Sequence, residues 1–140
     1  MFALDPETLR LIREWVEKAE NDLTNAAYVL KMGKQCPTDT VCFHTQQCVE
    51  KYLKALLVHH ERDIPWTHNV GLILSRLPAS ARPDLTPDEQ QRLTDYATVM
   101  RYPGDYEIIP LTEARQAVKI ARRVRRQIRK RLPKEALRSK

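Results

Sequence analysis

Three polar side chains near the middle of the chain have the spacing of neighbours on one helix face. Gln47, Glu50 and Lys54 stand at positions i, i+3 and i+7. An acid beside a base at this spacing forms either a surface ion pair, worth roughly 0.2–0.5 kcal/mol, or a partly shielded polar cluster at a cleft or dimer seam. Both interpretations remain open, because this flank borders the apolar stripe of the same segment and does not oppose it.

The stretch MRYPGDYEI, residues 100–108, carries a second candidate group. Arg101 stands just before a proline-glycine break that should end a helix. A cation in the last turn of a helix stabilises the exposed carbonyl groups there. The same guanidinium group could also stabilise negative charge on a phosphate. The arginine therefore has one structural and one chemical interpretation.

Metal and cofactor chemistry find little support in the sequence. No two of the four histidines stand at a metal-ligand spacing, and the three cysteines form no CxxC pair. We expect His68, just after Thr67 at a helix start, to fix its loop through a hydrogen bond. No phosphate-binding loop, dinucleotide fingerprint or nucleophile elbow occurs. We therefore expect no metal and no cofactor.

Basic side chains gather in the last part of the chain. Residues 111–140 hold 12 Lys and Arg against 2 Asp and Glu, whereas residues 1–110 hold 12 against 16. A helix in this part would place five bases along one face: Arg115, Lys119, Arg122, Arg126 and Arg129. Such a row is either a solvated face or a surface that contacts phosphates. Arg125 falls inside the apolar stripe, so we expect it to reach solvent or to pair with a buried acid or a partner subunit.

The hydrophobic pattern predicts helices throughout. Apolar residues recur every three or four positions in five segments, and no alternation typical of strands appears. We expect the first four helices to be capped by Asp5, by Thr38 or Asp39, by Thr67 and by Thr86, and the fifth to begin at Thr112. The prediction is an all-α antiparallel up-and-down bundle of four to five helices. We assign residues 1–132 to this bundle and residues 133–140 to a basic C-terminal tail.

Length and composition are those of one globular domain. The 140 residues are 42% hydrophobic and 30% charged, which suffices for a core and argues against disorder. The apolar runs are too short to span a bilayer, and the N-terminus carries acids where a signal peptide needs bases. We therefore expect a cytoplasmic protein without membrane attachment.

Four segments together resemble the HEPN domain family: AENDLTNAAYVL, FHTQQCVEKYLKALL, THNVGLILSRL and LTDYATVMRYP. The similarity extends from about residue 9 to residue 132, and its most specific part is QQ-x-x-EK-x-LKALL followed by TH and RYP. HEPN domains are linked to nucleotide binding and RNA cleavage. The resemblance implies a helical bundle that forms a homodimer with a site near the dimer cleft. Many members are ribonuclease toxins encoded beside a minimal nucleotidyltransferase, while others have lost cleavage.

The resemblance also gives the stretch around Arg101 a specific meaning. Nuclease members carry an arginine, four to six further residues and then a histidine, which exchanges protons near neutral pH. Arg101 matches the arginine, but Tyr106, Glu107 and Ile108 occupy the three positions open to the histidine. A tyrosine with an ordinary pKa of about 10 is a poor base at pH 7. The incomplete motif predicts that ribonuclease activity is absent.

Three functions follow from these observations. The first is a non-catalytic homodimeric HEPN module that binds a nucleotide or nucleic acid and pairs with a minimal nucleotidyltransferase. In it, Lys54 and Arg101 would bind phosphate, and Gln47 and Tyr106 would add hydrogen bonds. As an alternative, Glu50 would orient Arg101 through a charge-assisted pair. The second is an active ribonuclease toxin that uses Arg101 and Tyr106. The third is a non-specific DNA- or RNA-binding protein that uses the basic last helix. We expect the first.

Overall fold

The computed structural model describes residues 4–98 and 107–138, and every regular element within these ranges is a helix. The five α-helices are α1 (Pro6–Leu30), α2 (Thr38–His59), α3 (Val70–Ser75), α4 (Pro87–Tyr96) and α5 (Leu111–Arg131). Short 3₁₀ helices follow at Gly33–Gln35, Ala79–Ala81 and Lys134–Ala136. The prediction of an all-α bundle is confirmed.

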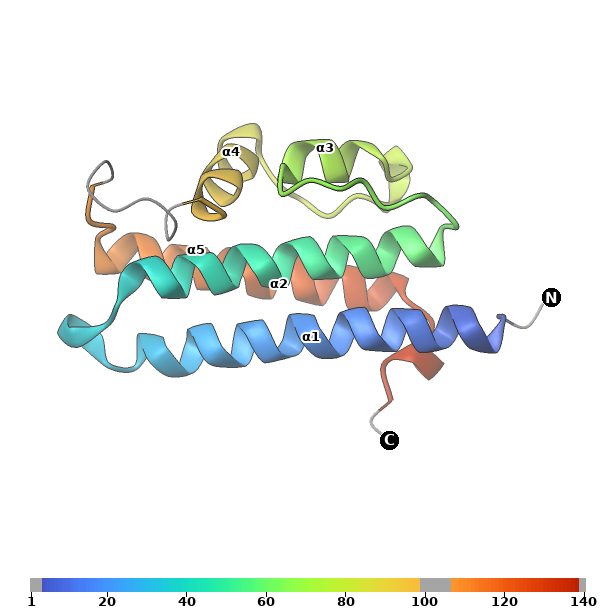
Figure 1. Cartoon of the computed structure of the whole chain (residues 1–140), viewed down its shortest axis with the longest axis horizontal. Coiled ribbons are helices and arrows are strands. Elements are labelled where there is room, and N and C mark those ends of the chain that lie inside the picture. The colour runs from blue at the N-terminus through green and yellow to red at the C-terminus, as the bar shows by residue number, and fades with distance from the viewer. Residues whose placement is uncertain (1–3, 99–106, 139–140) are drawn as a thin grey trace.

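Helix α2 is the centre of the bundle. It contacts each of the other four α-helices. The long helices α1 and α2 run antiparallel, α5 lies behind them, and the short helices α3 and α4 cover α2 on the side away from α1 (Figure 1). Helix α5 also contacts α1. One consequence is that few faces of α2 reach solvent.

The core is built from the apolar stripes of the three long helices. The apolar stripe of α2 is buried: Cys42, Val49, Tyr52, Leu53, Leu56 and Leu57. The apolar stripe of α5 is buried as well: Ala114, Ala117, Val118, Ala121 and Ile128, together with Leu132 at its C-cap. Because α2 is surrounded, polar side chains at the edge of its stripe are also buried. Thr45, Gln46 and Glu50 are the buried polar residues of α2.

Two of the predicted helix starts are confirmed. Asp5 caps α1 by accepting a hydrogen bond from the backbone N–H of Thr8 at 3.2 Å, with Pro6 in the first helical position. Thr86 and Glu89 form both halves of a capping box at the start of α4. In each case a residue that can accept a hydrogen bond stands directly before a proline.

The other three predicted starts are wrong by one or two residues. Pro37 precedes α2, and no side chain caps that helix. Asn69 caps α3, with its Oδ1 accepting from the N–H of Leu72 at 3.1 Å, while Thr67 accepts from the N–H of Asn69 outside the helix. Helix α5 begins directly after Pro110. Proline supplies a fixed φ angle, so α2 and α5 start without a side-chain cap.

The segment after Leu132 lies against α1. Ala136 is buried, and the guanidinium group of Arg13 donates to the carbonyl oxygen of Glu135 at 2.6 and 3.0 Å. The division of the chain at residue 132 stays a prediction. No helix in the described part of the chain combines the length and apolar character needed to cross a bilayer.

Candidate functional site

Glu50 is the centre of a buried polar cluster on α2. The residue is only 2% exposed, and its carboxylate accepts hydrogen bonds from Gln46 Nε2 at 2.7 Å, Lys54 Nζ at 2.8 Å and His68 Nδ1 at 2.8 Å. Burial alone would raise the pKa of Glu50, but the hydrogen bonds from Lys54 and His68 outweigh burial and hold that pKa below its usual value. The carboxylate therefore stays charged inside the protein.

Of the three residues singled out on this flank, Lys54 bonds Glu50 directly, whereas Gln47 reaches Glu50 only through Gln46, which was not among them. Gln47 Nε2 donates to Gln46 Oε1 at 2.7 Å, and the ammonium group of Lys54 lies 5.3 Å from the centre of the Trp15 ring. The interpretation as an exposed surface pair is wrong, because Glu50 is buried, the Lys54 side chain is only 14% exposed, and His68 of the loop before α3 bonds the carboxylate. The expectation that His68 fixes its loop is confirmed by its bond to Glu50.

Arg101 and Tyr106 lie outside the described residues, so the proposed contact between Arg101 and Glu50 stays a prediction. Within the described residues, Lys54 and His68 already share the charge of Glu50. The described part of the chain holds no group of three His, Cys, Asp or Glu side chains that could bind a metal ion.

A second buried acid joins α1 to α2. Asp22 accepts from His44 Nδ1 at 2.8 Å and from Lys51 Nζ at 2.5 Å. Sequence reasoning missed this group because its members are 22 and 29 residues apart along the chain. The available signal was position, because Asp22 stands three residues after Ala19 and four before Ala26, on the buried stripe of the first helix. Its position between two helices makes it a structural contact.

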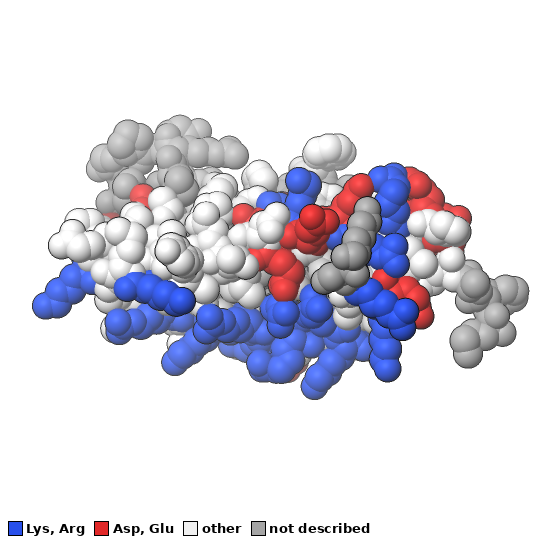
Figure 2. Space-filling model, turned by 90° about the horizontal axis from the view of Figure 1, so that it is seen from below, with Lys and Arg blue, Asp and Glu red and all other residues white. Residues whose placement is uncertain are grey.

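The basic row predicted on the last helix is present on α5. Arg115, Lys119, Arg122 and Arg126 are exposed and form no ion pair with another described residue. Viewed from below, Lys and Arg side chains gather along one long edge of the molecule (Figure 2). The fifth member, Arg129, is half-buried and donates to the Tyr52 hydroxyl at 3.2 Å.

Other arginines of α5 are held by acids and do not belong to the exposed row. Arg123 forms a two-pronged pair with Glu89 of α4, at 2.8 and 2.9 Å. This pair, with the bond from the backbone of Thr86, lowers the pKa of Glu89 to about 2. Arg125 donates to Glu20 of α1 at distances of 2.8 to 3.0 Å, which confirms the expectation of an acidic partner.

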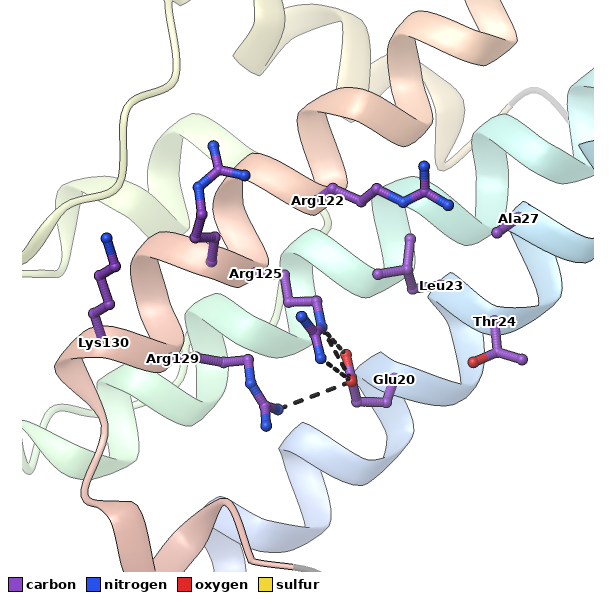
Figure 3. A pocket seen from close by; sticks show the side chains of 9 residues that line it. Glu20, Leu23, Thr24, Ala27, Arg122, Arg125, Arg129 and Lys130 are labelled. Atoms are coloured by element: carbon purple, nitrogen blue, oxygen red, sulfur yellow. Dashed lines mark hydrogen bonds and ion pairs between the residues drawn. The ribbon is translucent and has the colours of Figure 1, made fainter.

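A groove with a volume of about 700 Å³ runs between α1 and α5. Its α5 wall carries only cationic side chains, and its α1 wall carries Glu20, Leu23, Thr24 and Ala27. The cationic wall consists of Arg122, Arg125, Arg126, Arg129 and Lys130. Among the described residues that line the groove, Glu20 is the single acid, and it points at Arg125 and Arg129 (Figure 3). Beyond these residues, a second hollow of about 440 Å³ continues toward Arg13 and Leu137.

Glu20 is held in its charged state. Burial acts to raise the pKa of Glu20, but hydrogen bonds from Arg125 and from the Tyr52 hydroxyl, at 2.6 Å, outweigh it and lower that pKa. One carboxylate thus neutralises part of a wall that carries five positive charges. The groove keeps a strong excess of positive charge, which suits it to an anionic ligand.

The comparisons with known proteins assign this fold. Residues 12–131 match the HEPN domain. The chain belongs to the HEPN domain family. Two solved structures resemble this HEPN chain. The crystal structure of TT1696 from Thermus thermophilus has a TM-score of 0.70 and 26% identity, covering 86% of this chain and 98% of that one. The structure of ST0689, an archaeal HEPN homologue, has a TM-score of 0.67 and 25% identity, covering 86% and 96%.

No curated protein matches the chain. The family resemblance inferred from the four sequence segments is confirmed, as is the helical bundle. In this HEPN domain the segments QQ-x-x-EK and TH meet in space, because Glu50 of the first binds His68 of the second. The groove, by contrast, is formed by α1 and α5, and its acid Glu20 was missed by sequence reasoning.

Proposed function

We propose that this HEPN domain is a nucleic-acid-binding module that holds a phosphate backbone along α5. The observation that carries the proposal is the row of exposed bases Arg115, Lys119, Arg122 and Arg126, which borders the cationic groove. Contacts from these cationic side chains to phosphates do not depend on the nucleotide sequence, and they release counterions when they form. The row supports backbone binding and gives no reason for sequence preference.

The Lys and Arg side chains on this face of α5 follow one side of the helix at intervals of three or four residues. From Lys119 to Arg126 the helix rises by roughly 10 Å, so the cations can contact successive phosphates of one strand. Thr24 and Ala27 on the opposite wall carry no charge and leave the attraction undiminished. Lys130 extends the wall beyond Arg126.

The proposal includes how the module works with other chains. In it, the domain is a homodimer, pairs with a minimal nucleotidyltransferase, and binds RNA without cleaving it. The support for the first two points is the family resemblance. The support for the third is the sequence, in which Tyr106, Glu107 and Ile108 occupy the positions open to the motif histidine. A phosphate site that combines Gln47 and Lys54 with Arg101 would be a separate contact of the same module.

A charge-reversal experiment tests the nucleic-acid proposal. The double variant Arg122→Glu, Arg126→Glu should lose retention of a mixed RNA pool at low salt, because it places two acids in the basic row. The matched control is Arg62→Glu, Arg76→Glu, which lowers the net charge equally at exposed positions of other elements. The control should bind RNA almost as the wild type does. Equal loss in both variants would show a dependence on net charge alone and would contradict the proposed surface.

A further inference from the structure

The rim of the groove carries an exposed aromatic ring. Tyr28 of α1 is 73% exposed, follows Ala27 directly and stands one helical turn beyond Thr24, and both of these neighbours line the groove. The ammonium group of Lys31 lies over the Tyr28 ring, 5.7 Å from its centre. The ring therefore contributes little to the core and is presented to solvent beside the basic wall.

The antiparallel arrangement of α1 and α5 brings this ring beside the basic row. Arg13 contacts Glu135, and Glu20 contacts Arg125, so positions further along α1 meet positions earlier on α5. Continuing this register by eight residues places Tyr28 level with the turn of α5 that carries Lys119. The groove itself extends along α1 from Glu20 to Ala27, the residue next to Tyr28, and along α5 as far as Arg122.

The charge around Tyr28 is positive on both helices. From residue 23 to residue 35 the chain holds two lysines, Lys31 and Lys34, and no acid. The opposite helix contributes Lys119 and Arg115, both exposed. A ligand with a polyanionic backbone would be attracted to this end of the groove, and the nucleobases of a nucleic acid would meet the face of the Tyr28 ring there.

We propose that the groove binds single-stranded nucleic acid, with the backbone on α5 and an unpaired base stacked on Tyr28. This inference rests on the proposed function and adds the class of ligand. A basic groove beside an exposed aromatic ring is the arrangement with which proteins bind single strands, because every unpaired base offers a face for stacking. Paired bases are stacked on one another inside a duplex and cannot reach the ring.

The test measures binding of four ligands of matched length by fluorescence anisotropy: single-stranded RNA, an abasic strand, duplex RNA and inorganic polyphosphate. Tyr28→Leu should lower the affinity for single-stranded RNA roughly five- to tenfold and leave the affinities for the other three ligands unchanged. Tyr28→Phe should bind as the wild type, because it keeps the ring. The exposure of Tyr28 predicts unchanged melting temperatures, which thermal unfolding of both variants checks.

The outcomes separate this inference from the proposed function. Unchanged binding by Tyr28→Leu, or equal weakening of all four ligands, would overturn the stacking inference while the basic row stands. Weakened binding by Tyr28→Leu together with normal binding by Arg122→Glu, Arg126→Glu would overturn the backbone proposal and leave stacking. No binding of any ligand by the wild type would overturn both.

Discussion

Replacing Glu50 by glutamine removes the charge at the centre of the buried cluster while keeping the shape of the side chain. In the wild type this carboxylate accepts from Lys54, His68 and Gln46. In the variant the Lys54 ammonium, whose side chain is 14% exposed, loses its counter-ion. Removing one member of a buried ion pair costs about 3–5 kcal/mol. Because Lys54 keeps some contact with water, we expect a loss of about 3 kcal/mol in the free energy of unfolding.

The assay is urea unfolding followed by circular dichroism at pH 7, with thermal unfolding in parallel. A loss of this size should lower the melting temperature by roughly 10 °C for a chain of this length. Glu7→Gln is the control, because Glu7 pairs with Arg10 on the exposed face of α1 and its loss should leave no measurable change. A loss below about 1 kcal/mol for Glu50→Gln would refute the conclusion that the cluster stabilises the fold.

The pH dependence of the same variant gives an independent check. The folded-state pKa of Glu50 lies below its ordinary value of 4.5, so its contribution is present above that value. That contribution is lost as the pH falls below 4.5 and the folded carboxylate becomes protonated. The stability difference between the wild type and Glu50→Gln should therefore shrink in acid. A difference that stays constant from neutral pH into acid would show that the charge of Glu50 is not the cause.

Three further predictions concern other sites. Glu20→Gln removes the acidic side chain that faces the cationic wall of the groove, so RNA binding at low salt, measured by anisotropy, should become stronger. Weaker RNA binding would contradict the role given to the groove. The Arg123 pair lowers the pKa of Glu89 from 4.5 to about 2. The difference in the free energy of unfolding between the wild type and Arg123→Gln should therefore shrink as the pH falls across that range. A difference that stays constant in urea unfolding would contradict the pairing. Native protein should be alkylated first at the half-buried Cys36. Burial raises the pKa of the Cys42 thiol to about 12, so Cys42 forms little of the reactive thiolate. Mass spectrometry that finds Cys42 modified first would disprove this order.

The helical bundle could be predicted because its signals are local. The capping box at Thr86 and Glu89 uses two residues three positions apart, and the buried stripe of α2 repeats every three or four residues. The starts of α2 and α5 were misplaced because each helix follows a proline and has no side-chain cap. The start of α3 was misplaced because two neighbouring residues, Thr67 and Asn69, are able to cap. Which one does so depends on how the preceding loop packs, and spacing along the chain does not contain that information.

The candidate site was predictable only in part, for the same reason. Periodicity places the basic row on one face of α5 and Arg125 inside the apolar stripe, where it should reach solvent, contact a partner subunit or pair with a buried acidic partner. It does not identify that partner, since Glu20 lies 105 residues away in the chain. The depth of Glu50 was missed likewise, because His68, which bonds its carboxylate, lies 18 residues away in the chain. A groove between α1 and α5 exists only once the register of the two helices is known.

The salt dependence of RNA binding tests the central claim most directly. Four exposed bases on α5, Arg115, Lys119, Arg122 and Arg126, would neutralise about four phosphates of a single strand, which predicts a slope near −3 in a plot of log K against log salt. Affinity measured by anisotropy should then fall roughly 50-fold between about 50 and 200 mM salt. A slope near zero, or no RNA binding at the lower salt concentration, would contradict the assignment of α5 as a phosphate-binding surface.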